Sequence, residues 1–150
     1  MTKPILCLDF DGVLHEYTSG WEGARTISDM PVNGAMEFLL DSLEHFDVAI
    51  LSSRSHRLFG RWAMKRWLRM CLEGWFDACL ERAYLPPFYD PAMGTHEEER
   101  RGWARTVVRM IRWPKHKPPA LLTIDDRAIT FTGEWPSMEE IKAFKPWNKK

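Results

Sequence analysis

Four aspartates at the ends of two apolar runs are the clearest candidates for chemistry in this sequence. Asp9 and Asp11 occur where the run from Pro4 ends, and Asp125 and Asp126 occur where a later run, LLTID, ends. If these carboxylates share one pocket, they repel one another strongly unless a cation neutralises them. Oxygen-only ligands of this kind suit Mg²⁺. The pattern therefore predicts a magnesium site.

Other polar residues stand next to the remaining strand-like runs. Ser52 and Ser53 end the apolar run that begins at Asp47, and Lys115 and Lys117 precede the last run. In open parallel sheets, ligands bind outside the carboxyl ends of the strands. We therefore expect the serines and the four aspartates to converge on a single crevice. A serine at a strand end is also a common cap, so a structural role for Ser52 stays open.

The elements that position these residues follow from hydrophobic patterning. Nearly continuous apolar runs predict buried strands at 4–10, 47–52 and 121–125. Apolar residues at helical spacing predict helices at 34–45, 57–73 and 96–113. A strand–helix–strand order implies right-handed crossovers into a parallel sheet. The sequence also predicts a short strand at 128–132 and a tail helix capped by Ser137, with Glu140 at capping-box spacing.

Length and loop pattern favour one α/β domain over residues 1–150. We expect a Rossmann-like, doubly wound, three-layer α/β/α arrangement around a mainly parallel sheet. The connection at about 14–33 is polar and glycine-rich, which predicts a flap, and the stretch at about 85–95 is a proline-rich insertion. Both are too short to encode a large cap domain.

Composition excludes several classes of protein. The 21 basic and 21 acidic residues balance, so no global field draws the chain to nucleic acid or to an anionic membrane. No apolar run approaches the roughly 20 residues that span a bilayer, and no signal-like segment begins the sequence. Three cysteines without CxxC spacing argue against disulfides and zinc. We therefore expect a cytoplasmic protein.

The ordered strand-end motifs resemble those of the haloacid dehalogenase-like (HAD) hydrolase superfamily. ILCLDFDGVLH is similar to the family's first motif, DxDGxxx, and VAILSS to its second. KPPALLTIDD is similar to the third and fourth motifs together. The resemblance spans residues 5–131 and is closest to small, capless bacterial and phage members.

The resemblance implies a role for each aspartate. Asp9 is the nucleophile that attacks phosphorus and forms an aspartyl phosphate. Asp11 is the acid/base that protonates the leaving oxygen and later deprotonates water. The metal is held by Asp9, the backbone carbonyl of Asp11, and Asp126. Whether Asp125 contacts it directly or through water stays open.

The resemblance also implies how the phosphoryl group is bound. Ser52 donates to a phosphate oxygen through its hydroxyl and the following amide, and Ser53 is its alternative. Lys117 adds a positive charge to the same group. Lys115 is a second candidate for this lysine, and the spacing excludes neither.

The function implied is a Mg²⁺-dependent phosphatase that hydrolyses a phosphate monoester of a small molecule, without a membrane partner. One alternative is a nucleotide or nucleic-acid-end phosphatase, favoured if a stripe of arginines borders the crevice. These arginines are Arg101, Arg105, Arg109 and Arg112. Another is a non-catalytic module that binds Mg²⁺ or phosphate, against which the acid at Asp11 argues. A site this open can also be completed by a second subunit in a homo-oligomer.

Three further residues near the motifs have two interpretations each. Arg54 and Arg127 either reach a second phosphate or a substrate carboxylate, or they pair with a nearby acid. His15 either faces the substrate or closes the turn after the first motif.

Overall fold

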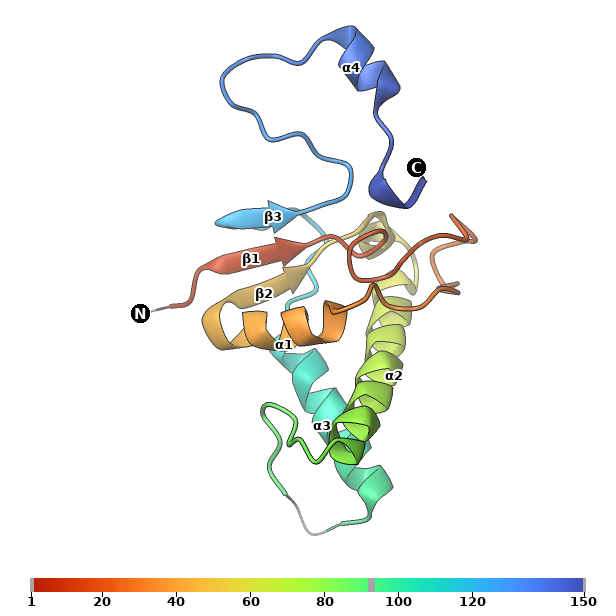
Figure 1. Ribbon diagram of the computed structural model, residues 1–150, viewed down its shortest axis with the longest axis vertical. Helices are drawn as coiled ribbons and strands as arrows, with labels where there is room; N and C mark the ends of the chain where they lie inside the picture. Colours follow the sequence, from red (N-terminus) through yellow and green to blue (C-terminus); the bar gives the residue numbers. More distant parts are fainter. Residues whose placement is uncertain (1, 92–93, 150) are drawn as a thin grey trace.

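The fold is built on a three-stranded parallel sheet. The computed structural model describes residues 2–91 and 94–149. Its strands are β1 (Ile5–Leu8), β2 (Asp47–Ile50) and β3 (Leu122–Ile124), in the order β2-β1-β3 (Figure 1). Cys7 of β1 stands opposite Ala49 on one side and Thr123 on the other. The predicted α/β class and parallel sheet are confirmed, with all three strands shorter than their apolar runs.

Three helices and the sheet share one hydrophobic core. They are α1 (Ala35–His45), α2 (Gly60–Glu81) and α3 (His96–Met110). Each contributes buried side chains to the cluster that contains Leu6 and Leu8 of β1. Because side chains alternate along a strand, these leucines mark the sheet face that the helices cover.

The helices form where the sequence predicts them, but some apolar residues at helical spacing are exposed instead of buried. Helix α2 begins three residues later than the pattern predicted and runs on past Trp75 and Phe76, since Phe76 continues the buried stripe of the helix. The apolar spacing also predicts that Leu58, Trp62 and Phe38 are buried, but all three are exposed, and Leu58 precedes the helix.

Side-chain caps fix the starts of two helices. Thr95 accepts from the backbone of Glu98 at the start of α3, and Ser137 does the same with Glu140 for α4 (Met138–Ala143). In both cases the glutamate reaches back to the cap residue, so the capping box predicted at Ser137 is confirmed. A short 3₁₀ helix, η2 (Trp147–Lys149), follows α4.

The third strand is an edge rather than a buried strand. Leu122 is 58% exposed, and the predicted burial of this run is wrong. The reason is that nothing pairs with its outer edge within the described residues. The predicted strand at 128–132 is not formed, and Ile129 and Phe131 in it are exposed.

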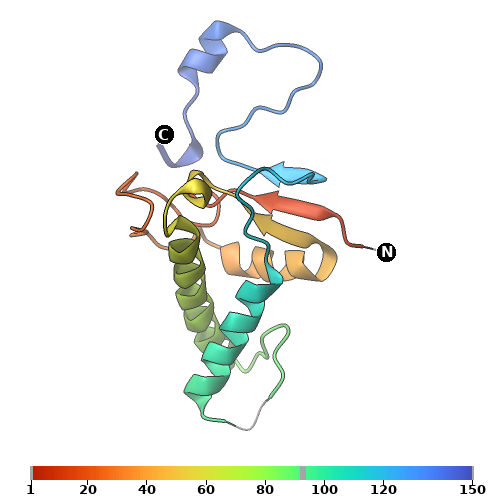
Figure 2. The same cartoon turned by 180° about the vertical axis from the view of Figure 1, so that it is seen from behind.

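The chain returns from α3 to β3 without a helix. Residues 111–121 are irregular, carry three prolines, and pass in front of the strands in Figure 2, which shows the molecule from behind. Arg112 forms a parallel bridge with Ala49, so this segment extends the sheet beside β2 by one residue. A second helical layer on this side would need a helix here. The predicted doubly wound, three-layer arrangement is therefore not confirmed.

The two predicted irregular segments lie in connections. Residues 16–30 of the flap have neither helix nor strand, and an isolated bridge pairs His15 with Pro31 at its base. The proline-rich segment joins α2 to α3, and residues 92–93 of it lie outside the described residues. In the described part of the chain, no helix is long and apolar enough to cross a membrane.

Candidate active site at the carboxyl ends of the strands

Five of the predicted site residues line a cavity where the three strands end, whereas Asp126 lies beside it and is not in the lining. The volume of the cavity is about 290 Å³. The lining residues come from the ends of all three strands and from the flap: Asp9, Asp11, Tyr17, Ser52, Ser53, Asp125 and Arg127. Parallel strands end at the same edge of a sheet, which is why segments far apart in sequence meet here. The convergence expected from the sequence is present.

Three of the four aspartates form a tight carboxylate cluster. One carboxylate oxygen from each of Asp9, Asp125 and Asp126 lies within 4.8 Å of the others. The side chain of Asp126 is only 1% exposed, and neither of its oxygens has a hydrogen-bond partner among the described residues. The Arg127 Nε stands 3.7 Å away. A buried carboxylate without hydrogen bonds is costly, and these three carboxylates could hold a metal ion.

The electrostatics of the cluster point the same way. Burial raises the pKa of Asp9 to about 7, a shift partly opposed by a hydrogen bond from the backbone of Phe10 and reinforced by the charges of Asp125, Asp126 and Asp11. Burial also raises the pKa of Asp126. Without a counterion, these carboxyl groups therefore resist ionisation.

Gly12 allows the turn after β1 to lie against this cluster. Its backbone is left-handed, with φ 86°, and a Cβ on it would overlap the carboxylate of Asp126. Trp147 of η2 donates its indole N–H to the Gly12 carbonyl at 2.7 Å. The C-terminal segment thus fixes the same turn from outside.

Asp11 turns its carboxylate away from the cluster. It accepts a hydrogen bond from Arg54 Nε at 2.8 Å and one from His15 Nδ1 at 3.0 Å. Burial raises the pKa of Asp11, but the bonds from His15 and Arg54 and their charges outweigh burial, so the pKa lies below its ordinary value. In this conformation Asp11 is a bound carboxylate rather than a free acid.

His15 closes the turn after the first motif. The backbone N–H of Asp29 donates to His15 Nε2 at 3.0 Å, which assigns the ring proton to Nδ1, the nitrogen that faces Asp11. The ring is 1% exposed. Of its two interpretations, the structure favours the closing of the turn.

Arg54 connects the site to the flap. Its side chain is fully buried, and besides pairing with Asp11 it donates through Nη1 to three flap carbonyls, those of Gly23, Ala24 and Thr26. The indole of Trp21 packs over its guanidinium at 4.8 Å. Pairing with an acid was one of the two sequence interpretations of Arg54, and it is the one observed.

Of the residues predicted to hold a phosphate, the two serines lie at the cavity and the two lysines do not. Ser52 is 6% exposed and caps the 3₁₀ helix η1 (Ser53–His56), accepting from Arg54 N at 3.3 Å, while Ser53 is exposed. Both serines line the cavity. Lys115 and Lys117 are exposed, and neither belongs to the cavity lining.

The cavity also contains residues that sequence reasoning missed or left out. Tyr17 lines it with a left-handed backbone, φ 60°, and the guanidinium of Arg127 lies 5.8 Å from its ring centre. The backbone N–H of Arg127 donates a hydrogen bond to Asp125 Oδ1 at 2.8 Å. Hydrophobic periodicity could not place Tyr17 in the cavity, because the flap has no periodic pattern. Its position shortly after the first motif is the only sequence feature that indicates a place near the site.

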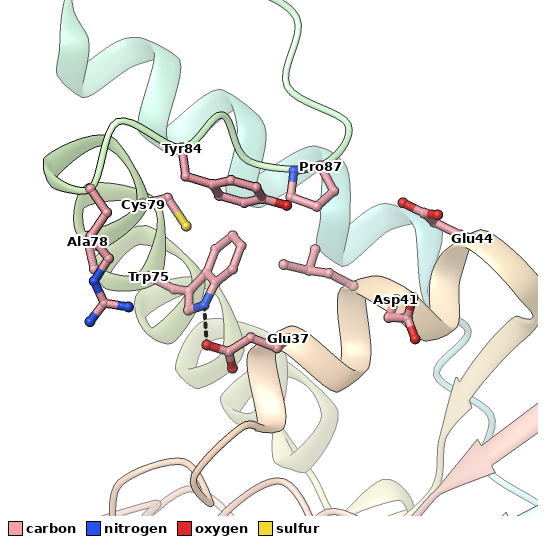
Figure 3. A pocket seen from close by; sticks show the side chains of 10 residues that line it. Glu37, Asp41, Glu44, Trp75, Ala78, Cys79, Tyr84 and Pro87 are labelled. Atoms are coloured by element: carbon pink, nitrogen blue, oxygen red, sulfur yellow. Dashed lines mark hydrogen bonds between the residues drawn. The ribbon is translucent and has the colours of Figure 1, made fainter.

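A larger cavity lies elsewhere and shares no residue with the site. Its volume is about 460 Å³, and it is enclosed by α1, the end of α2 and the loop that follows (Figure 3). Trp75 Nε1 donates to Glu37 Oε1 at 2.9 Å across one end. Asp41 and Glu44 stand on the α1 side. None of the predicted site residues lies there.

Comparison with known proteins gives no assignment: no family model, no curated protein and no solved structure matches this chain. The function is therefore inferred from the residues of the site and their geometry. Of the two cavities above, the one at the strand ends is lined by Asp9 and Asp125, whose carboxylates lie within 4.8 Å of the buried carboxylate of Asp126.

Proposed function

We propose that this protein is a Mg²⁺-dependent phosphatase of the HAD type, which hydrolyses a phosphate monoester through an aspartyl phosphate on Asp9. One observation carries the proposal: the buried carboxylate of Asp126, which accepts no hydrogen bond, lies beside Asp9 and Asp125 at the carboxyl ends of parallel strands. Arg127 is the one ion-pair partner of Asp126 in the described residues, at 3.7 Å, and a catalytic cation would bind the Asp126 oxygens directly. The doubly wound, three-layer fold belongs to the same proposal, and the strand order β2-β1-β3 is compatible with it.

The donor set fits a hard divalent cation. Asp9 and Asp126 would hold it, together with the backbone carbonyl of Asp11, and Asp125 would bind directly or through water. All these donors are oxygens, which Mg²⁺ prefers. When bound, the ion would offset the repulsion between Asp9 and an anionic phosphate and stabilise the charge of the transferring group.

The chain's own residues perform the two displacements. A carboxylate oxygen of Asp9 attacks phosphorus, forming an O–P bond as the bond to the ester oxygen breaks. A proton from Asp11 goes to that leaving oxygen. In the second step Asp11 takes a proton from water, whose oxygen attacks phosphorus and releases Asp9 and inorganic phosphate.

This acid/base role requires Asp11 to change partners. Its lowered pKa and its bonds to Arg54 and His15 disfavour the protonated form in the present conformation. A phosphate ester bound in the cavity would add negative charge beside Asp11, which raises the pKa of Asp11 and favours its protonated form. Ser52 and Ser53 are within the cavity to receive the phosphoryl group, and Lys117 would have to approach from outside it.

Turnover of an aryl phosphate tests the reaction class. We expect release of the phenol in the presence of Mg²⁺ and none above background with a chelator. Stoichiometric Mg²⁺ or phosphate binding without turnover would support the non-catalytic alternative instead. The arginine stripe does not line the cavity, so no observation here favours a nucleic-acid-end phosphatase over a small-molecule phosphatase.

Metal-free protein should lose stability as the pH rises from about 4 to about 7. The folded pKa of Asp9 is about 7, against 3.8 for an ordinary aspartate, so the folded state keeps a proton that the unfolded state has already released. Stability falls with pH wherever the folded state binds more protons. Mg²⁺ should therefore raise the melting temperature more at pH 8 than at pH 5, as thermal melts with and without chelator will measure.

Asp126→Asn and Asp41→Asn are the matched variants for this experiment. Asp126→Asn should lose most of the Mg²⁺-induced shift. Asp41→Asn should keep it, although Asp41 belongs to another acidic group, with Glu44 and His45, on the surface of α1. An equal Mg²⁺ shift in the wild type and Asp126→Asn would place the metal elsewhere.

A further inference from the structure

Two helices that pack together carry long stretches with basic residues and no acids, although the chain as a whole is neutral. No aspartate or glutamate occurs between Asp47 and Glu73, nor between Glu99 and Asp125. These two stretches include most of α2 and α3, which lie side by side in both views of the molecule (Figures 1 and 2). Basic residues of one helix are therefore brought next to basic residues of the other over these stretches, while beyond them Glu73 and Asp77 of α2 pair with Arg100 of α3.

A groove between the helices is lined almost entirely by cations. Its volume is about 280 Å³. Its lining residues, here called the basic groove, are Trp62, Lys65, Arg66, Arg69, Arg105, Val108 and Arg109. A second hollow of about 370 Å³ adjoins it through the shared residues Arg69 and Arg105, and there the acid Glu73 is also in the lining. The arginine stripe of α3 is thus only one wall of a two-helix surface.

Most of these cations have no acidic partner. Arg69 approaches Glu73 at 3.6 Å, but Lys65, Arg66, Arg105 and Arg109 form no ion pair among residues 2–91 and 94–149. Elsewhere on the same helices arginines are paired, as in Arg101 with Glu97. Unpaired cations facing one groove create a local positive potential that favours a polyanion. The net charge of the whole chain, which is zero, does not reveal this local positive potential.

Aromatic side chains lie among the cations. Trp62 is 54% exposed on the groove wall, with the guanidinium of Arg66 at 5.7 Å from its ring centre. Lys65 Nζ lies 5.7 Å from the ring centre of Trp113. A basic groove with an exposed aromatic ring is how proteins hold single-stranded nucleic acid, because the cations follow the phosphates and the ring stacks on a base.

We propose that the basic groove of α2 and α3 binds single-stranded nucleic acid, with its phosphates on Arg66, Arg69, Arg105 and Arg109 and a base stacked on Trp62. A flat anionic membrane cannot enter a concave groove between two helices. Duplex DNA keeps its bases inside, where Trp62 cannot stack on them. None of the groove residues lines the cavity at Asp9, so this binding is independent of the proposed phosphatase reaction.

Fluorescence anisotropy with a labelled oligothymidylate of about 12 nucleotides tests the proposal, in the range of site sizes of such grooves. We expect saturable binding that weakens with salt, at about 0.7 in log K per log salt for each phosphate contact. Arg66→Glu/Arg109→Glu should weaken binding and lower the salt slope by about 1.4, for two lost phosphate contacts. Arg82→Glu/Lys142→Glu, which changes net charge equally at exposed positions away from the groove, should bind like the wild type.

Further variants and competing ligands test whether binding depends on base stacking, on the phosphatase site or on charge alone. Trp62→Ala should weaken the oligonucleotide complex about tenfold, in line with the loss of one stacked base, whereas Trp135→Ala, which removes an 86% exposed tryptophan, should not. Asp9→Asn should bind as the wild type does. The proposal is overturned by equal affinity in the two double variants, by tighter binding to inorganic polyphosphate than to the oligonucleotide, or by binding to phosphatidylserine vesicles in its place.

Discussion

Replacing Asp9 with asparagine should lower the turnover of an aryl phosphate at least about a thousandfold, because the amide cannot form the aspartyl phosphate. The side chain keeps its shape, so the fold should persist. Since burial and three neighbouring carboxylates raise the pKa of Asp9, the neutral amide should also increase the melting temperature of the metal-free protein above pH 7. Each unit of pKa shift corresponds to about 1.4 kcal/mol.

Loss of activity and gain of stability together distinguish a chemical role from a structural one. Asp41→Asn, at an exposed position on α1, should change neither kcat nor the melting temperature. If Asp9→Asn retains turnover within tenfold of the wild type, another nucleophile acts. If Asp9→Asn instead lowers the melting temperature above pH 7, then the ionised Asp9 carboxylate makes favourable interactions in the folded protein, contrary to its raised pKa.

The parts of this structure that the sequence predicts well are those with local causes. A continuous apolar run can be buried as a strand, and the polar residues that end it must lie at the sheet edge, so Asp9, Asp125 and Ser52 meet as expected. The Ser137 cap is equally local, since its hydroxyl and the Glu140 carboxylate satisfy backbone groups within one helical turn.

The parts that the sequence does not predict depend on neighbours far along the chain. The run LLTID has the composition of a central strand, but burial needs a cover, and none is formed beyond β3 in the described residues. Trp62 matches the apolar spacing of α2, but it faces α3 at a position where both helices present cations. The partners of Arg54 lie in the flap, which has no periodic pattern that would place them.

Arg54→Met should destabilise the fold by about 3–5 kcal/mol, the usual cost of removing one member of a buried ion pair. Three flap carbonyls would lose the Arg54 donor, and Asp11 would keep only its hydrogen bond from His15. The backbone cannot relax easily here, because Gly60 packs so closely against the Arg54 carbonyl that a Cβ would overlap it. Urea unfolding gives the loss, and faster tryptic cleavage after the exposed Arg25 would show that the flap is released.

A matched variant and a double variant show which part of this cost comes from charge. Arg57→Met removes an exposed arginine three residues away and should cost less than about 0.5 kcal/mol, as surface substitutions usually do. Arg54→Met/Asp11→Asn should recover part of the loss, because the unpaired carboxylate is no longer buried. Equal stability of Arg54→Met and Arg57→Met would mean that the flap is held without Arg54. If the double variant is less stable than Arg54→Met by the full cost of Asp11→Asn alone, the two side chains are not coupled, and the bond between them does not hold Asp11 in its present orientation.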